Sequence, residues 1–168
     1  LKTSSGKKIV VIGGGFLGSE LAVSISRFGA NLGHKVTQIF PEDGNMALVF
    51  PKYLSRWTTE KVSSLGVMVR SGRLVTCIER NELEDGDKLR LVLDNGEKVE
   101  ADHVIVAVGV DPSFNRMFGS SSLPLNEETG GVEADRYLRV APDVFAAGDV
   151  VSYVDPILNC RRRSVNFD

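Results

Sequence analysis

Residues 10–20, "VVIGGGFLGSE", decide the fold that this sequence predicts. The segment starts as an apolar, β-branched run, passes through three consecutive glycines and continues directly into helix-forming residues. Gly13, Gly15 and Gly18 have the spacing GxGxxG, which alone is a weak signal in a chain with 17 glycines. The context strengthens it, because the motif directly follows a predicted buried strand and opens a predicted helix.

A strand, a helix and a second strand are predicted at residues 7–14, 16–28 and 34–40. This order forms a βαβ unit, whose crossover should be right-handed. The helix is predicted to pack one apolar stripe against the sheet, formed by Leu17, Leu21, Ile25 and Phe28.

Each glycine of the motif has a predicted physical task. Gly13 permits the tight turn, Gly15 lets the backbone approach a pyrophosphate, and Gly18 lets the helix pack closely on the strand. The N–H groups at residues 15–18 and the positive end of the helix dipole would then face the phosphates. The alternative is a glycine-rich strand–helix turn that holds no ligand.

The first carboxylate after the second predicted strand is Glu42, in "FPEDGN". It stands where an acidic residue would accept hydrogen bonds from the adenine ribose and repel a 2′-phosphate. No arginine lies between Lys35 and Lys52, so the sequence favours NAD(H) over NADP. The alternative is that Glu42 is a solvated loop carboxylate.

The middle of the chain predicts a helix at residues 51–66, with Trp57 as a core anchor. Four strand candidates follow: "VMVRSG", "LVTCIERN", "KLRLVLDNG" and "KVEADHVIVAVG". Turn signals at residues 84–87 and 94–97 favour a β-meander in place of the third helix of a doubly wound fold. Residues 103–109 should then return to the parallel sheet.

The last part of the chain is rich in loops, with a short helix predicted near Phe114 and two short strands within residues 137–150. Cys77 lies in an alternating stretch and is predicted to be a small core residue. The two cysteines and two histidines lack the spacing of a redox pair or a metal site.

Composition places the chain among ordinary globular proteins, with 42% hydrophobic and 25% charged residues. The net charge of −2 gives no overall reason to expect nucleic acid or an anionic membrane as a partner. No apolar run has the length of about 18 residues that a membrane-spanning helix needs. Both ends of the sequence suggest an internal fragment of a longer protein.

Two further motifs point to a class of flavoproteins. The segment "VAPDVFAAGD" (140–149) is similar to the C-terminal flavin motif of glutathione-reductase-like proteins, and "VIVAVGVDP" (104–112) to the strand that precedes it. The resemblance implies that Asp149 binds the ribityl and pyrophosphate region of FAD and that Gly109 lies near the bound NAD. It also implies a Rossmann-like NAD(H)-binding domain at residues 7–112, and a return segment of the FAD-binding domain at residues 113–168.

Among the glutathione-reductase-like proteins, longer segments of the sequence resemble one family in particular. From about Lys7 to Arg163 the chain resembles the apoptosis-inducing-factor family of mitochondrial flavoproteins, in the segments "GGGFLGSELA", "FPEDGNM", "YLSRWTTEKV", "ADHVIVAVGVDP" and "VFAAGDV" followed by "RRR". The resemblance implies that Phe16 stacks at the junction of nicotinamide and flavin and that Glu20 binds the nicotinamide amide. These two are the implied catalytic residues, and the NAD site is completed by Gly14, Gly15, Leu17, Glu42 and Gly109.

The family implies an NADH:acceptor oxidoreductase that transfers a hydride from NADH to FAD and forms a homodimer on reduction. It further implies the mitochondrial intermembrane space, partners in mitochondrial import and, on cell-death signalling, partners in DNA degradation in the nucleus. The fragment alone is expected to be inactive. Alternatives are an NADH dehydrogenase or ferredoxin reductase of the same fold, or a mainly non-enzymatic NADH-sensing interaction protein.

Two single positions depart from the family, and one run of arginines has two interpretations. Leu48 stands in a segment where the family often has a lysine that holds NAD, and Asn166 stands where a flavin-side histidine is expected. The run Arg161 to Arg163 suits a nuclear-localisation signal or a nucleic-acid patch. The alternative for the arginines is a solvated loop or ion pairs.

Overall fold

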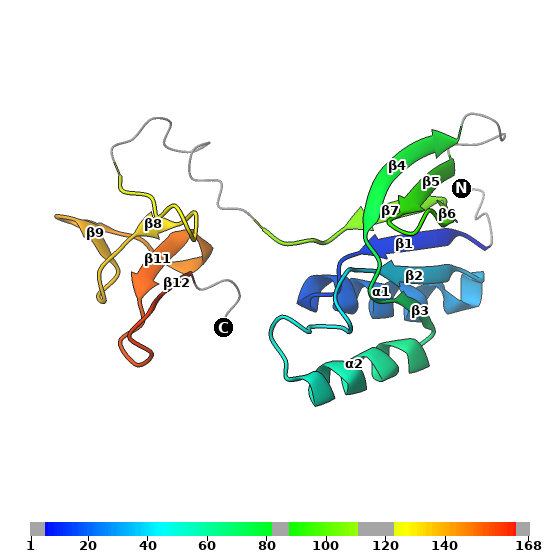
Figure 1. Cartoon of the computed structure of the whole chain (residues 1–168), viewed down its shortest axis with the longest axis horizontal. Coiled ribbons are helices and arrows are strands. Elements are labelled where there is room, and N and C mark those ends of the chain that lie inside the picture. Colours follow the sequence, from blue (N-terminus) through cyan, green and yellow to red (C-terminus); the bar gives the residue numbers. More distant parts are fainter. Residues whose placement is uncertain (1–5, 82–87, 111–122, 164–168) are drawn as a thin grey trace. The chain divides into compact units, whose positions relative to one another are not determined.

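The structure, a computed structural model, describes residues 6–81, 88–110 and 123–163. The chain divides into two compact units, Leu1–Gly109 and Val110–Asp168, called unit 1 and unit 2 below (Figure 1). None of the helices in the described part of the chain combines the length and the apolar character that a membrane span needs.

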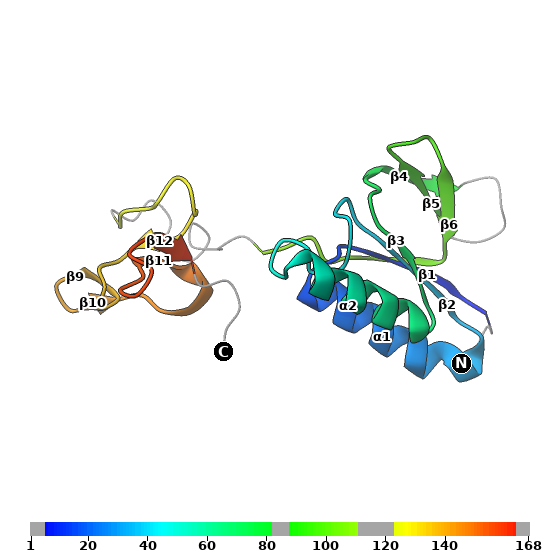
Figure 2. The same ribbon diagram turned by 60° about the horizontal axis from the view of Figure 1, so that its bottom comes forward.

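Unit 1 is built on a four-stranded parallel sheet with the strand order β3-β2-β1-β7. Its strands are β1 (Lys8–Ile12), β2 (Lys35–Ile39), β3 (Val67–Arg70) and β7 (His103–Val106). The helices are α1 (Phe16–Gly29), the short η1 (Ala30–Leu32) and α2 (Lys52–Ser64). Helices α1 and α2 cover the same face of the sheet (Figure 2). The predicted α/β class and the βαβ unit around the glycines are confirmed.

The other face of the sheet carries an antiparallel meander with the order β4-β5-β6. Its strands are β4 (Val75–Asn81), β5 (Lys88–Leu93) and β6 (Lys98–Ala101). The meander lies between β3 and β7 in the chain, which confirms the predicted replacement of the third helix. The first of the four predicted strands, Val67–Arg70, pairs with β2 in the parallel sheet instead of joining the meander. The predicted turn at residues 84–87 lies outside the described residues.

The core of unit 1 consists of two layers on either side of the parallel sheet. Val10 and Ile39 pack against Leu91 and Leu93 of the meander. On the opposite face a second cluster joins the sheet to the helices, formed by Val11, Ala22, Val36, Val62 and Val67. These two layers fix the carboxyl ends of β1 and β2, where the glycine loop begins.

The prediction for the buried face of α1 was right only in part: Ile25 packs against the core on the helix side of the sheet, but two of the four predicted residues are exposed. Leu17 and Phe28 are 61% and 84% exposed, while the buried face consists of small residues: Gly18, Ser19, Ala22, Ser26 and Gly29. The cause is the close packing of both ends of the helix, since a Cβ atom on Gly18 would lie 2.3 Å from the carbonyl oxygen of Gly13, and one on Gly29 would lie 2.8 Å from the His34 side chain. Leucine side chains do not fit into that space.

Two single-residue predictions about burial were also wrong. Trp57 is 59% exposed, because α2 turns Ser55 and Val62 toward the interior. Cys77 is exposed and belongs to neither of the two core clusters of unit 1.

Unit 2 consists of short strands and turns. A three-stranded sheet has the order β12-β11-β8, and β9 pairs with β10. The elements are β8 (Val132–Glu133), β9 (Arg139–Ala141), β10 (Val144–Phe145), the short helix η2 (Gly148–Val150), β11 (Val151–Val154) and β12 (Arg161–Arg163). The strands β9 and β10 confirm the two predicted within residues 137–150. The sequence did not predict β11 and β12, and the helix predicted near Phe114 lies outside the described residues.

Candidate functional site

Two glycines of the GxGxxG motif, Gly13 and Gly18, are required by the backbone around them. Gly13 has φ +122°, and a Cβ atom there would lie 2.1 Å from the carbonyl oxygen of Ala107. Gly18 lies against the carbonyl of Gly13, as described above. The loop is therefore pressed between β7 and the first turn of α1, and side chains are excluded at both positions.

Gly15 is different, because nothing in the chain requires a glycine there. Its φ of −74° suits any residue, and a Cβ atom would meet no atom within 4 Å. The space in front of Gly15 adjoins the N-terminus of α1, which has no side-chain cap and no acidic residue in its first turn. The open space and the uncompensated positive end of the helix suit an anionic group.

A network of buried polar side chains holds the glycine loop in place through hydrogen bonds. The Gln38 side chain is fully buried, and its Nε2 donates to the carbonyl oxygen of Gly13 at 2.9 Å. The Asn45 Nδ2 donates to Ser19 Oγ at 2.8 Å and to Gln38 Oε1 at 2.9 Å. In addition, the Met46 N–H donates to the carbonyl of Gly14 at 2.7 Å. The loop is thus fixed by polar groups that no water reaches.

Helix α2 anchors this network. The Ser55 hydroxyl donates to the Asn45 carbonyl, and the Asn45 N–H donates to Thr59 Oγ1, each at 2.8 Å. None of the polar side chains of this network was predicted from the sequence as part of the site. The signal that could have found Gln38 is an uncharged polar side chain in a strand predicted to be buried on both faces.

A cavity of about 630 Å³ lies beside the loop in unit 1. Five of the predicted site residues line it: Gly13, Gly14, Gly15, Glu42 and Gly109. The opposite wall comes from the start of β4, and Leu48 also lines the cavity. The size is ordinary for a small-molecule site, and the place is the carboxyl edge of a parallel sheet, where ligands of α/β folds bind.

Glu42 lies three residues after the end of β2, on the wall of this cavity. Its backbone carbonyl accepts the N–H of Gly72 at 2.9 Å, which ties the loop after β2 to the loop after β3. No ion pair involves its carboxylate among the residues that the structure describes. The carboxylate is therefore available to a ligand.

The structure brings an arginine to the same wall. Arg73 lines the cavity, its N–H donates to the Phe40 carbonyl, and its Nη1 donates to the Gly72 carbonyl at 2.7 Å. The inference that no arginine near Glu42 would accept a 2′-phosphate was therefore incomplete. Arg73 could have been found from the sequence, because it closely follows β3 and the ends of neighbouring parallel strands meet at one edge.

Phe16, Leu17 and Glu20 do not line this cavity. The Phe16 ring meets Phe50 edge to face, with 5.7 Å between ring centroids. The exposed Glu20 borders a separate hollow of about 360 Å³ together with Met46. The roles of Phe16 and Glu20 at the nicotinamide remain predictions.

The flavin-side residues belong to unit 2. Asp149 is exposed and lies in η2, directly after Gly148, whose φ is +75°. A Cβ atom on Gly148 would meet no atom within 4 Å, so this turn leaves room for a ligand. Asn166 lies outside the described residues.

The three arginines form β12 and are engaged within unit 2. Arg161 donates to the Ser152 carbonyl at 2.9 Å, and Arg162 pairs with Asp155 at 3.4 Å. Arg163 donates to the Val110 carbonyl at 3.1 Å. Arg162 is thus in an ion pair, while Arg161 and Arg163 donate to backbone carbonyls.

Two aspartates of unit 2 close turns with their carboxylates. Backbone N–H groups of Arg139 and Tyr137 lower the pKa of Asp135. The N–H groups of Leu158 and Ile157 lower the pKa of Asp155, to which Arg162 adds a smaller effect. Hydrogen bonds of this kind stabilise the ionised carboxylate.

Comparison with known proteins agrees with this geometry. The chain is 40% identical over 163 residues to "Apoptosis-inducing factor 1, mitochondrial" of Dictyostelium discoideum, covering 97% of this chain and 30% of that protein. It is 38% identical over 148 residues to the chloroplastic monodehydroascorbate reductase 5 of Oryza sativa subsp. japonica, covering 88% and 28%. Among solved structures, the ferredoxin reductase for the CYP199A2 system from Rhodopseudomonas palustris superposes with a TM-score of 0.77 at 26% identity, covering 94% and 36%.

The parallel sheet, the meander and the cavity at the glycine loop define a nucleotide-binding α/β unit of the oxidoreductase type. The chain belongs to the pyridine nucleotide-disulphide oxidoreductase family, whose sequence pattern it matches over residues 1–164. The resemblance to apoptosis-inducing factor is confirmed by two such relatives, at 40% and 38% identity. The chain spans less than a third of the length of these relatives, 30% and 21%.

Proposed function

We propose that this chain supplies the pyridine-nucleotide site, and one edge of the flavin site, of an oxidoreductase that reduces FAD with NADH. The observation that carries the proposal is the open space at Gly15. Neither the backbone conformation nor the packing of the chain requires a glycine there. The space borders both the helix N-terminus and the 630 Å³ cavity, so it suits the pyrophosphate of a dinucleotide.

Each of the candidate residues has a distinct task in this proposal. The backbone from Gly13 to Gly18 binds the pyrophosphate, and Glu42 accepts the hydroxyls of the adenine ribose. Leu48 packs beside the adenosine where the family often has a lysine, and Gly109 leaves room near the nicotinamide. We assign residues 7–112 to the NAD(H)-binding domain and residues 113–168 to the FAD-binding domain.

The reacting end of the nucleotide is assigned to Phe16 and Glu20. An aromatic ring at the start of α1 can stack on a cofactor ring, and a carboxylate one turn later can accept hydrogen bonds from the nicotinamide amide. Asp149 and Asn166 are assigned to the flavin. When both cofactors are bound, they supply the hydride chemistry, and this chain supplies placement and electrostatics.

At a finer level we propose a protein of the apoptosis-inducing-factor type. In such a protein, NADH is a conformational signal as well as a reductant, and the reduced form is a homodimer. The proposal includes a mitochondrial location with partners in protein import, and a nuclear role in DNA degradation on cell-death signalling. Its support is the identity to two proteins of that name.

The second candidate is a reductase with a dedicated electron acceptor. The identity of 38% to a monodehydroascorbate reductase and the similarity to a ferredoxin reductase favour this alternative. Turnover separates the two candidates, because a sensor recycles NADH slowly with every acceptor, whereas a reductase is fast with one of them.

The test is rapid anaerobic mixing of the full-length, FAD-containing protein with NADH, followed by the loss of flavin absorbance. Monodehydroascorbate, a ferredoxin or a generic quinone is then added, and the molar mass is measured before and after reduction. Rapid reduction, slow reoxidation and a doubled mass support the sensor type. A flavin that NADH does not reduce would refute the proposed function altogether.

A further inference from the structure

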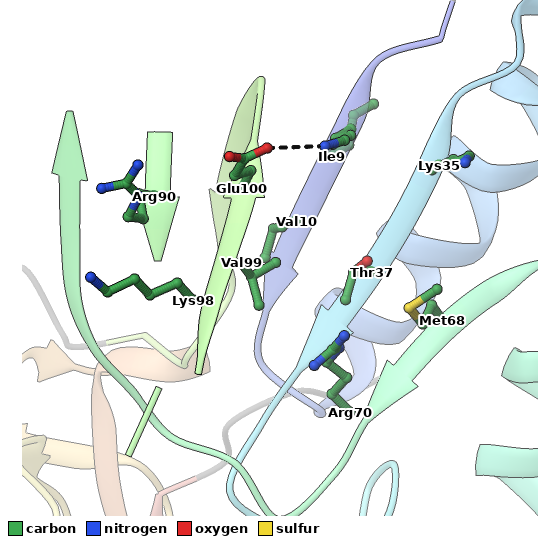
Figure 3. Close-up of a pocket in the computed structure, with 11 residues that line it drawn as sticks. Ile9, Val10, Lys35, Thr37, Met68, Arg70, Arg90, Lys98, Val99 and Glu100 are labelled. Carbon is green, nitrogen blue, oxygen red and sulfur yellow. Dashed lines mark hydrogen bonds and ion pairs between the residues drawn. The ribbon is translucent and has the colours of Figure 1, made fainter. Parts of the chain in front are cut away.

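Phe16, the first residue of α1, belongs to an aromatic pair. Its ring meets the ring of Phe50 edge to face, with 5.7 Å between the centroids and 89° between the ring planes. Both side chains are half-buried. Neither ring lines the cavity beside the glycine loop, nor the cavity of about 650 Å³ on the meander face of the sheet, whose lining residues are drawn in Figure 3. The pair is therefore a separate feature next to the candidate site.

The backbone around Phe50 is fixed from both sides. On one side the Met46 N–H donates to the Gly14 carbonyl at 2.7 Å, and the Phe50 N–H donates to the Met46 carbonyl at 2.8 Å. On the other side Pro51 is the N-cap of α2, and its carbonyl accepts two N–H groups from the first turn of the helix, each at 3.0 Å. A residue before proline is also restricted to extended backbone conformations. Residues 46–50 thus hold the Phe50 ring at a defined place beside the glycine loop.

Phe16 lacks a restraint that most helical side chains have. Inside a helix, the preceding turn disfavours one of the three χ1 rotamers. Phe16 has no preceding helical turn, and at Gly15, the residue before it, even an added Cβ atom would meet no atom within 4 Å. The Phe50 ring supplies a restraint from another segment, because edge-to-face aromatic pairs are favourable beyond the area that they bury. The pair therefore favours one orientation of the Phe16 ring.

The geometry of the pair is compatible with a cofactor ring on Phe16. An edge-to-face contact covers at most one face of either ring, and stacking on a cofactor needs only one face. The Phe16 ring also follows directly after Gly15, the position proposed for the pyrophosphate. Because residues 46–50 are hydrogen-bonded to the glycine loop, one continuous set of contacts holds both the pyrophosphate site and the ring.

We propose that Phe50 is a positioning residue, whose ring fixes the orientation in which Phe16 stacks on the nicotinamide and thereby aligns NADH with the flavin. The step affected is the transfer of one hydride, with its two electrons, by which NADH is oxidised to NAD⁺ and FAD is reduced. Phe50 acts through Phe16 and takes no part in the reaction itself. The inference rests on the proposed function, which assigns Phe16 to the reacting end of the nucleotide.

The test is rapid anaerobic mixing of the full-length, FAD-containing protein with a series of NADH concentrations. It yields the limiting rate of flavin reduction and the Kd of NADH as separate quantities. Phe50→Leu keeps an apolar side chain but removes the aromatic pair, so the limiting rate should fall about fivefold. The Kd of NADH should change less than about twofold, because the contacts of pyrophosphate and ribose are intact. Phe50→Tyr retains the ring and should retain the wild-type rate.

A double variant shows whether Phe50 acts through Phe16. Phe16→Leu should slow flavin reduction, and the addition of Phe50→Leu should slow it no further, because the ring that Phe50 orients is already absent. A readout independent of the rate is the long-wavelength charge-transfer absorbance of the reduced flavin with NAD⁺, which depends on the overlap of the two cofactor rings. At saturating NAD⁺, Phe50→Leu should weaken this absorbance and Phe50→Tyr should retain it.

The matched control is Tyr53→Leu on α2, which removes a nearby aromatic ring that is 76% exposed. It should change neither the rate nor the absorbance. If Phe50→Leu does not retain FAD, Phe50→Met takes its place with the same expected results. A wild-type rate in Phe50→Leu, an equal loss in Phe50→Tyr or Tyr53→Leu, or additive losses in the double variant would overturn the inference. A wild-type flavin that NADH does not reduce would instead refute the proposed function.

Discussion

Gly13, Gly15 and Gly18 belong to one motif, but different constraints keep them as glycines. The chain excludes a side chain at Gly13 and Gly18, where a Cβ atom would lie 2.1 Å and 2.3 Å from backbone oxygens. At Gly15 the chain excludes nothing. The motif therefore combines a folding requirement with a binding requirement, and substitutions can separate the two.

Gly15→Ala should impair binding while the protein remains folded. The added methyl group occupies the open space, so NADH affinity should fall about tenfold or more, which is 1.4 kcal/mol. The free energy of unfolding should fall by about 1 kcal/mol at most, as for a helix N-cap. By contrast, Gly18→Ala should destabilise the fold by about 3 kcal/mol through overpacking. Urea unfolding and NADH titration check both, and equal stability losses would contradict the distinction.

The pair of Glu42 and Arg73 should decide between NADH and NADPH. Glu42→Gln removes the carboxylate that repels a 2′-phosphate and leaves the arginine in place, so NADPH affinity should rise about tenfold. In the double variant Glu42→Gln with Arg73→Gln, this gain should disappear. A double-mutant cycle with titration of both nucleotides measures the coupling. Additive effects of the two substitutions would show that Arg73 does not contact the 2′-phosphate.

At the scale of elements, the connection from β2 to α2 holds the glycine loop through Gln38 and Asn45. Gln38→Leu leaves the Gly13 carbonyl and one Asn45 hydrogen bond unpaired in the interior. We expect a loss of about 3 kcal/mol in the free energy of unfolding and weaker NADH binding. The neighbouring Thr37→Val is the control and should cost less than about 1 kcal/mol. Unaltered stability of the Gln38 variant would contradict this role of the network.

The turn after β11 should depend on pH through Asp155. Hydrogen bonds from Leu158 and Ile157 lower the folded-state pKa of this carboxyl. The stability that the ionised carboxylate adds to the turn is therefore fully present above about pH 4, the pKa of an unfolded aspartate. The contribution is lost as the pH falls through the lowered folded-state pKa. Amide NMR signals of Ile157 and Leu158 should report this loss in acid. Asp155→Asn should remove the dependence, and an unchanged titration in that variant would refute the assignment.

At the scale of the whole molecule, the elements that could be predicted from the sequence are those that local sequence patterns determine. The βαβ unit, the meander and the turn at residues 94–97 follow from hydrophobic periodicity and from turn residues. The buried side of α1 follows only in part from hydrophobic periodicity, because the helix lies close to Gly13 at Gly18 and close to His34 at Gly29, and only small residues fit at these two positions.

Contacts between distant segments also escaped prediction. Arg73 joins Glu42 on one cavity wall only because β2 and β3 are neighbours that end at the same edge. Such sites depend on tertiary structure, and the sequence shows them only once the strand order is known.

The central claim is that the cavity beside the glycine loop binds NADH. The most direct test is a calorimetric titration of the protein with NADH and with NADPH, for the wild type and for Gly15→Ala. We expect saturable binding of one NADH, weaker binding of NADPH and a large loss of NADH affinity in the variant. No saturable binding of either nucleotide to the folded wild type, or equal NADH affinity in both proteins, would contradict it.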